Sequence, residues 1–283
     1  MSAAVLSLVR GRERHLANML AGLACQTRPA DETVVAYMQD DPPAVSAPLP
    51  VRFVPAPGEP MPLAAARNRA ARASGADVLI FLDVDCVPHD GLVEAFCAAV
   101  EPGRVVMGDA RYLSETDDAS GAFETLWAGA KRHPARPAPE DGEARPLSSM
   151  NELWSLCFAL PRDLFETAGG FDEAFTGYGG EETDFAARLD ALGAKLWFAP
   201  QARAVHQWHA VDIPPLKHFD AIIANARRFR DKHGRWCMEY WLGQFAAAGY
   251  VDWREDAERL EVLRRPTRAE RDAARQPGDV LYS

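Results

Sequence analysis

The sequence has no uninterrupted apolar stretch long enough to cross a membrane. Its first apolar run, residues 3–9, is short, and charged side chains from Arg10 to Arg14 follow it at once. A spanning helix needs about 20 predominantly apolar residues, and a secretory leader has its own charge and length pattern. We therefore expect neither a transmembrane helix nor a secretory signal in this sequence.

Positive charge and paired cysteines are also scarce. The sequence has 31 Lys+Arg against 41 Asp+Glu, a net charge of −10, which excludes a nucleic-acid binder that relies on overall basicity. The cysteines are five, an odd number, and no two form a C-x-x-C pair that would indicate a zinc or redox site. We expect the reduced thiols of a cytoplasmic protein. The cysteines are Cys25, Cys86, Cys97, Cys157 and Cys237.

What the sequence does have is enough apolar material for a large core. Hydrophobic residues make up 48% of its 283 positions and charged residues 25%, which suits one large or two small domains. Short apolar runs, typical of strands, alternate with segments whose apolar residues recur at helical spacing. This pattern predicts an α/β fold with a mostly parallel sheet. We expect strands at 4–9, 33–37, 51–54 and 77–82, and helices at 13–23 and 63–74.

The second half of the sequence is less regular. Residues 113–150 contain Pro134, Pro137, Pro139 and Pro146 among small and charged residues, and we interpret them as a long, mobile loop. Order returns with helices at 162–168 and 181–192 and a strand at 195–199. We expect residues 1–212 to form the main domain and 213–283 a helical extension packed on it. Its last thirty residues, 254–283, read as a solvated helix with a frayed tail.

Two aspartates follow the apolar strand at 77–82, in the order Asp83-Val84-Asp85. If the strand continues, both carboxylates point the same way. At about 6 Å separation they would repel by roughly 3 kcal/mol at an effective dielectric of 20. In open α/β sheets the ligand crevice lies beyond the carboxyl ends of the strands. A divalent cation bound to a phosphate therefore fits the pair. The plainer alternative is that one Asp caps the following helix and the other is solvated.

A second acidic cluster begins a helix after the glycine-rich turn Gly177-Tyr178-Gly179-Gly180. At 100° per residue, Glu181 and Glu182 lie within about 60° of the apolar stripe of that helix, and Asp184 lies about 100° away. Two acids thus point inward, where a raised pKa suits a general base. The alternative is that all three merely complement the helix dipole.

Two histidines, His206 and His209, follow the predicted strand at 195–199 next to Trp208. A lone histidine is usually structural, but imidazole beside carboxylate oxygens favours manganese over magnesium. Both histidines therefore stay open as metal ligands.

Several of these segments together resemble glycosyltransferases of the GT-A fold. The resemblance spans about residues 4–209 and is closest to the inverting family-two enzymes and the related β-galactosyltransferase group. It is carried by the first strand at 5–12, an Arg-Asn segment at 66–70, the Asp-x-Asp signature at 81–85, and a Gly-Gly-Phe turn with a Gly-Gly-Glu stretch at 169–184.

The resemblance implies a role for individual residues. Asp85 would bind the metal with His206, His209 being the second choice, and Asp83 would lie near the ribose and the metal. The acid after the first Glu is the family's base; here it is Glu182 instead of Asp, so Glu181 and Asp184 remain alternatives. Residues suited to the nucleotide or donor are Arg10, Arg12, Arg67, Asn68, Asp83 and Val84, with Arg69 as a further arginine. Residues suited to sugar or acceptor contact are Trp154, Trp127 and Gly180.

The implied reaction is transfer of a sugar, as by a hexosyltransferase, from a nucleoside-diphosphate donor, preferably UDP-linked, to an acceptor hydroxyl with inversion. Mn²⁺ is preferred to Mg²⁺ as the cofactor, and the loop at 113–150 would close over the donor. A retaining transferase, a nucleotidyltransferase on the same fold and a non-catalytic nucleotide-sugar scaffold remain alternatives.

The aromatic and basic residues of the C-terminal part bear on the acceptor and on a possible membrane surface. The acceptor could be a carbohydrate, a lipid-linked sugar or a small molecule. The aromatic stretch 236–242 could pack as core, build an acceptor pocket or rest on a membrane, so peripheral contact with the inner face of a membrane stays open. A basic cluster lies nearby, at Arg227, Arg228, Arg230, Lys232 and Arg235. The sequence predicts no nucleic-acid partner, and it leaves the oligomeric state undetermined.

Overall fold

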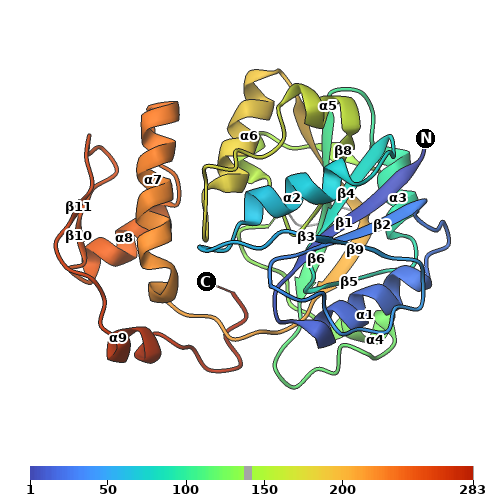
Figure 1. Cartoon of the computed structure of the whole chain (residues 1–283), viewed down its shortest axis with the longest axis horizontal. Coiled ribbons are helices and arrows are strands. Elements are labelled where there is room, and N and C mark those ends of the chain that lie inside the picture. The colour runs from blue at the N-terminus through green and yellow to red at the C-terminus, as the bar shows by residue number, and fades with distance from the viewer. Residues whose placement is uncertain (137–141, 283) are drawn as a thin grey trace.

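A mixed β-sheet forms the centre of the first 206 residues, with helices on both of its faces (Figure 1). The structure is a computed structural model, and it describes residues 1–136 and 142–282. Within these residues the main sheet has nine strands, eight of them in the order β3-β2-β1-β4-β8-β6-β9-β5, while β7 pairs with β9. The strands are β1 (Ala3–Val9), β2 (Glu32–Tyr37), β3 (Arg52–Pro55), β4 (Val78–Leu82), β5 (Cys86–Pro88), β6 (Arg104–Tyr112), β7 (Arg145–Pro146), β8 (Cys157–Pro161) and β9 (Lys195–His206).

Parallel pairing dominates the half of the sheet that the first four strands of the chain form. Strands β3, β2, β1 and β4 are all parallel, and β6 is parallel to β9. Strand β8 runs antiparallel between β4 and β6, and β5 is antiparallel to β9. The α/β class and the mostly parallel sheet are therefore confirmed.

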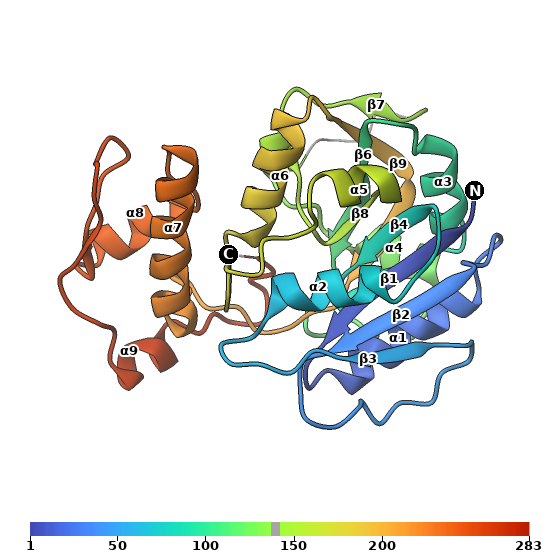
Figure 2. The same ribbon diagram turned by 45° about the horizontal axis from the view of Figure 1, so that its top comes forward.

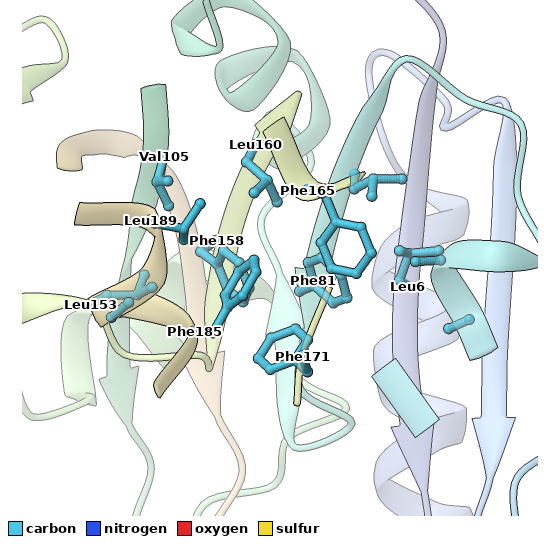
Figure 3. Close-up of a cluster of buried hydrophobic side chains, with 14 of the residues drawn as sticks. Leu6, Phe81, Val105, Leu153, Phe158, Leu160, Phe165, Phe171, Phe185 and Leu189 are labelled. Carbon is cyan, nitrogen blue, oxygen red and sulfur yellow. The ribbon is translucent and has the colours of Figure 1, made fainter. Parts of the chain in front are cut away.

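Two apolar layers, one on each face, hold the sheet to its helices (Figure 2). Helices α1 (Glu13–Ala24) and α3 (Leu92–Ala99) bury their apolar residues on one face. Helices α2 (Leu63–Arg72), α5 (Arg162–Thr167) and α6 (Glu181–Ala191) cover the other. Figure 3 shows that this second layer is rich in phenylalanine, and the rings of Phe81 and Phe158 stack with centroids 4.9 Å apart. Both faces of β4 are thus buried, as its continuous apolar run predicts.

The prediction of a structureless loop at 113–150 was wrong in part. Helix α4 (Phe123–Gly129) lies within it, and the strand β7 and the single-turn helix η1 (Met150–Glu152) follow. Helix α4 forms because Leu126 fills an apolar cluster with Val87, Leu113 and Val205, a long-range contact that composition does not reveal. Pro137 and Pro139 lie outside the described residues.

The chain beyond residue 212 forms an extension with its own apolar cluster, beside the sheet domain (Figure 1). It contains the helical turn η2 (Leu216–His218), helices α7 (Phe219–His233), α8 (Glu239–Ala247) and α9 (Arg268–Ala273), and a small sheet of β10 (Val251–Asp252) and β11 (Glu261–Val262). This part is therefore not wholly helical. No helix among the described residues is both long and apolar enough to span a membrane.

The end of the chain is anchored, contrary to the predicted frayed tail. The Gln276 N–H donates to the carbonyl of Val211 at 2.9 Å, and Leu281 is 7% exposed. The Tyr282 ring lies 4.3 Å from the His133 ring and 5.5 Å from the Tyr112 ring, centroid to centroid. Aromatic contacts with the sheet domain thus bring the described tail back between the two parts of the molecule (Figure 1).

Candidate active site

The Asp-x-Asp segment forms a turn, so the expectation that it continues the strand was wrong. Strand β4 ends at Leu82, and the Cys86 N–H donates to the carbonyl of Asp83 at 2.9 Å across the turn. The alternation of a strand therefore does not apply to the two carboxylates. Asp85 is 2% exposed, whereas Asp83 is partly exposed.

The pairing of β5 with β9 brings Asp85 to the histidines. Cys86 is opposite His206 in the antiparallel register, and the Gln207 N–H donates to the Asp85 carbonyl at 2.6 Å. As a result, one ligand atom from each of Asp85, His206 and His209 lies within 4.8 Å of the others. These three donors come from segments about 120 residues apart.

The chemistry of these donors fits a divalent cation. Burial lowers the pKa of His206 well below its usual value, so that the imidazole stays neutral and can donate its lone pair to a metal. One carboxylate and two imidazoles form a mixed oxygen and nitrogen set of the kind that first-row transition metals accept. Asp83 lies outside this cluster of three.

Two basic residues of the first helix region also reach Asp85. Arg12 forms an ion pair with Oδ2, and His15 Nδ1 lies 2.5 Å from Oδ1. Burial and the charge of Arg12 lower the pKa of His15 to about 4. Sequence reasoning missed His15; its position one helical turn after Arg12, just beyond the first strand, was the available signal.

The second acidic segment depends on its glycines for its shape. Gly179 and Gly180 have φ of +87° and +89°, in the left-handed region that favours glycine. A Cβ on Gly179 would lie 2.5 Å from Met238 Sδ of the extension, so the turn is also closely covered. Helix α6 begins directly after this turn and places its first acids at the edge of the sheet domain.

Glu181 and Glu182 have different surroundings. Glu181 is 6% exposed, accepts a hydrogen bond from Arg67 Nη1 at 3.0 Å, and has a pKa raised by burial. Glu182 is partly exposed and accepts the Ser155 backbone N–H at 2.7 Å. Arg67 also donates to Ser155 Oγ at 3.0 Å, so one segment supports both acids. Of these two acids, Glu182 is the one that remains accessible.

Asp184 points into the protein, and the expectation from the helical wheel was wrong. It is fully buried and accepts hydrogen bonds from Arg188 Nε at 2.9 Å and from Lys232 and His233 of α7 at 2.7 and 2.8 Å. The wheel considered one apolar stripe, but α7 covers this side of α6 as well. Asp184 thus joins the extension to the sheet domain.

Tyr178 connects the two acidic segments, and sequence reasoning gave it no role. Burial raises the pKa of its hydroxyl, and the charges of Glu182, Glu181 and Asp83 raise it further. Its ring stacks on His218 at 4.4 Å and lies 5.5 Å from Trp241 of the extension. Tyr178 therefore lies close enough to the carboxylates of both segments for their charges to act on it. An aromatic side chain inside a glycine turn was the available signal.

The residues predicted for the nucleotide lie in different places. Arg10 pairs with Glu59 near the surface, and Val84 is buried in the core. The Asn68 side chain both donates to the Phe171 carbonyl and accepts the Phe171 N–H at 2.8 Å, which fixes the Gly-Gly-Phe turn to α2. Arg69 donates to the Pro55 carbonyl at 2.8 Å. Of the four arginines named for this role, Arg12 is the one that reaches the Asp85 cluster.

The two tryptophans predicted for sugar contact lie in separate environments. Trp127 of α4 stacks with Phe123 and lies under the Arg111 guanidinium at 4.0 Å. Trp154 precedes Ser155, the residue that contacts Glu182, and the Arg136 guanidinium lies 3.7 Å from its ring centroid. Gly180, the third residue of this group, begins α6 as its N-cap.

Comparison with known proteins identifies the domain. Residues 45–167 match the family model for glycosyl transferase family 2, and residues 143–210 match the model described as the N-terminal domain of galactosyltransferase. The fold is similar to the crystal structure of S. aureus TarS 1-349, with a TM-score of 0.55 at 13% identity, over 88% of this chain and 73% of that one. The chain has the GT-A fold, and these two segments match glycosyltransferase families.

Two curated relatives are similar to this chain. Validoxylamine A glucosyltransferase of Streptomyces hygroscopicus subsp. jinggangensis is 27% identical over 230 residues, 71% of this chain and 54% of that protein. N-acetylgalactosaminyltransferase 6 of Drosophila melanogaster is 31% identical over 51% of this chain and 23% of that protein. The chain thus spans about half the length or less of these curated relatives.

A second solved structure has a similar fold. GalNAc-T7, crystallised with UDP, GalNAc and Mn²⁺, has a TM-score of 0.54 at 17% identity, over 74% of this chain and 43% of that one.

Proposed function

We propose that the protein is a metal-dependent, inverting glycosyltransferase that moves a sugar from a UDP-linked donor to an acceptor hydroxyl. The observation that carries the proposal is the cluster of Asp85, His206 and His209. It is supported by the charges of Glu182 and Asp83, which both act on Tyr178. The neighbour that was crystallised with UDP and Mn²⁺ supports the choice of nucleotide and cation.

Asp85, His206 and His209 would hold the cation, and the two imidazoles favour Mn²⁺ over Mg²⁺. When bound, the cation supplies Lewis acidity that neutralises charge on the leaving diphosphate. Arg12, paired with Asp85, adds positive charge on the same side. These residues bind and orient the donor so that its anomeric carbon faces the opposite wall.

Glu182 is the proposed general base. An acceptor hydroxyl has a pKa far above 7, so it needs a carboxylate to take its proton as the bond to the anomeric carbon forms. The Ser155 N–H fixes the Glu182 carboxylate by one oxygen and leaves the other available. Glu181, tied to Arg67, and Asp184, tied to α7, are less suited because their oxygens already have charged partners.

We propose that the acceptor, whether a carbohydrate, a lipid-linked sugar or a small molecule, enters beside the extension, where Tyr178, His218 and Trp241 form an aromatic wall. The five cysteines are all free, which supports a cytoplasmic location. If the acceptor is lipid-linked, we propose that the protein contacts the inner face of a membrane.

A donor panel tests the proposal. UDP-, GDP- and dTDP-sugars are incubated with the protein, with Mn²⁺, Mg²⁺ or EDTA, and the release of nucleoside diphosphate is measured. We expect UDP release that depends on Mn²⁺, and a product whose anomeric proton coupling shows inversion. Retention at the anomeric carbon would indicate the retaining alternative, and pyrophosphate release from a nucleoside triphosphate would indicate a nucleotidyltransferase. Binding without any turnover would indicate a scaffold.

A further inference from the structure

Arg136 lies against the end of the sheet that carries the site, and the proposed reaction gives it no role. It follows α4 in sequence, and its Nη1 donates to Met107 Sδ of β6 at 2.7 Å. Its guanidinium lies 3.7 Å from the centroid of the Trp154 ring, just before β8. Stacking on an aromatic face fixes the plane of a guanidinium and leaves its edge free to bind a ligand.

The neighbours of Arg136 belong to both parts of the proposed site. Trp154, on which Arg136 stacks, precedes Ser155, and the Ser155 N–H donates to Glu182. One neighbour of Arg136 is therefore next in sequence to the residue that positions the proposed base. On the other side, Arg136 lies near the Tyr112 hydroxyl, and the charge of Glu182 acts on it; the Tyr112 ring lies 4.9 Å from the His206 ring. Arg136 therefore has neighbours beside the cation cluster and beside the proposed base.

Arg136 has no carboxylate partner among residues 1–136 and 142–282. Its Nε is buried without a hydrogen-bond partner, and burial lowers its pKa to about 10. Other arginines that line this domain are paired: Arg132 with Asp109 at 2.7 Å and Arg67 with Glu181 at 3.0 Å. A partly buried cation without an ion-pair partner is costly unless a ligand supplies the anion.

We propose that Arg136, held on Trp154, is a subsite for the carboxylate of an acidic sugar, so that one substrate of the transferase is a uronic acid. This inference rests on the proposed function. An arginine edge binds a carboxylate through two parallel hydrogen bonds. The diphosphate is the less suitable partner, because it belongs beside Asp85, where Arg12 already lies, and no contact joins Arg136 to Asp85, His206 or His209 in the described structure.

The carboxylate could belong to the donor or to the acceptor, and calorimetry on the full chain with Mn²⁺ separates the two. The donor arm compares UDP-glucuronate with UDP-glucose. The acceptor arm compares methyl glucuronide with methyl glucoside in the presence of UDP. In one arm we expect the acidic compound to bind at least tenfold more tightly, and Arg136→Gln to remove that preference while UDP binding is unchanged.

Arg104→Gln is the matched control, because Arg104 also stacks on a tryptophan, Trp197 at 3.8 Å, but lies at the start of β6, away from the site. It should keep the preference for the acidic compound. Arg136→Gln should not lower the melting temperature, because the described structure shows no ion pair of Arg136 that the substitution would break. A melting temperature well below that of the wild type would overturn the inference in favour of a structural role.

Two further outcomes would overturn the inference. Equal binding of the acidic and neutral compounds in both arms would show that no carboxylate subsite exists. Equal weakening of UDP and of every UDP-sugar by Arg136→Gln would show that the arginine binds the diphosphate. Failure of the wild type to bind UDP or any UDP-sugar would instead contradict the proposed function, and the inference with it.

Discussion

At the scale of single residues, neighbouring acids differ by what each one touches. Glu181 has the buried guanidinium of Arg67 as its partner, while Glu182 has one backbone N–H and remains partly exposed. A carboxylate with a charged partner is a weaker base, and a carboxylate open to the crevice can reach a substrate proton. The contacts therefore separate two side chains that are adjacent in sequence and similar in chemistry.

Replacement of Glu182 by Gln should lower kcat by about 10²–10⁴-fold, because the base is lost while the acceptor for the Ser155 N–H is kept. Affinity for UDP with Mn²⁺, measured by calorimetry, should stay within about twofold of the wild type, since Glu182 is not part of the cation cluster.

Glu181→Gln is the matched control. It should lose stability, by about 1–3 kcal/mol in denaturant unfolding, because Arg67 is left buried with a neutral partner. Full activity in Glu182→Gln would contradict the assignment of Glu182 as the base. A loss of kcat confined to Glu181→Gln would assign that role to Glu181.

Sequence reasoning found the residues of this site that belong to local motifs. Asp85 comes directly after an apolar strand, and His206 ends the last long strand, so both carry a signal in their own segment. His15, Tyr178 and Arg136 do not, because each becomes relevant through a contact with a segment far away in the chain. A helical wheel misplaced Asp184 for the same reason.

At the scale of elements, helix α6 is held between two others. Its apolar face packs on the sheet, and its Asp184 side faces α7, which supplies Lys232 and His233. The helix that carries the proposed base is therefore positioned from both sides. The sequence predicted α6 with nearly the right ends but not its second neighbour.

Asp184→Asn should destabilise the protein by about 1–3 kcal/mol, measured by denaturant unfolding, because three donors lose their charged acceptor in a fully buried position. Asp172→Asn is the control: Asp172 also binds Lys232 at 2.7 Å, but its side chain is 30% exposed, so the cost should stay below about 1 kcal/mol. A large loss of kcat in folded Asp184→Asn, with no loss of stability, would contradict this structural role.

The contact of Tyr178 with His218 should make stability depend on pH. Burial, aided by Lys217 and opposed by Asp212, lowers the pKa of His218 in the folded state below its usual value near 6.5. Below about pH 6.5 the unfolded chain binds a proton that the folded chain does not, so stability falls as pH falls. Melting temperatures between pH 7.5 and 5 should therefore decrease less in His218→Phe than in the wild type. Equal slopes would contradict this reasoning.

At the scale of the whole molecule, the surplus of negative charge is divided among different surroundings. Part of the net charge of −10 lies in the two acidic segments. Asp184 and Glu181 are neutralised by protein cations. Asp85 lies beside Arg12 and the histidines, and Glu182 keeps a partly exposed carboxylate. A bound cation would reverse the local sign of the crevice on the side where an anionic donor must bind.

Cation and nucleotide should therefore stabilise the protein jointly. A ligand present at 100 times its Kd adds about 2.7 kcal/mol to the free energy of unfolding, or about 5 °C or more in Tm. We expect such a shift with Mn²⁺ and UDP together, a smaller one with either alone, and reversal by EDTA. His206→Asn should abolish the shift because it removes a buried ligand from the cluster.

His233→Asn is the control for this experiment: it lowers the starting Tm by loosening Asp184 but should keep the full shift, since His233 lies outside the cluster. A shift with UDP alone that Mn²⁺ does not increase would show that the donor binds without the cation. In that case Arg12, which already pairs with Asp85, would be the group that neutralises the diphosphate.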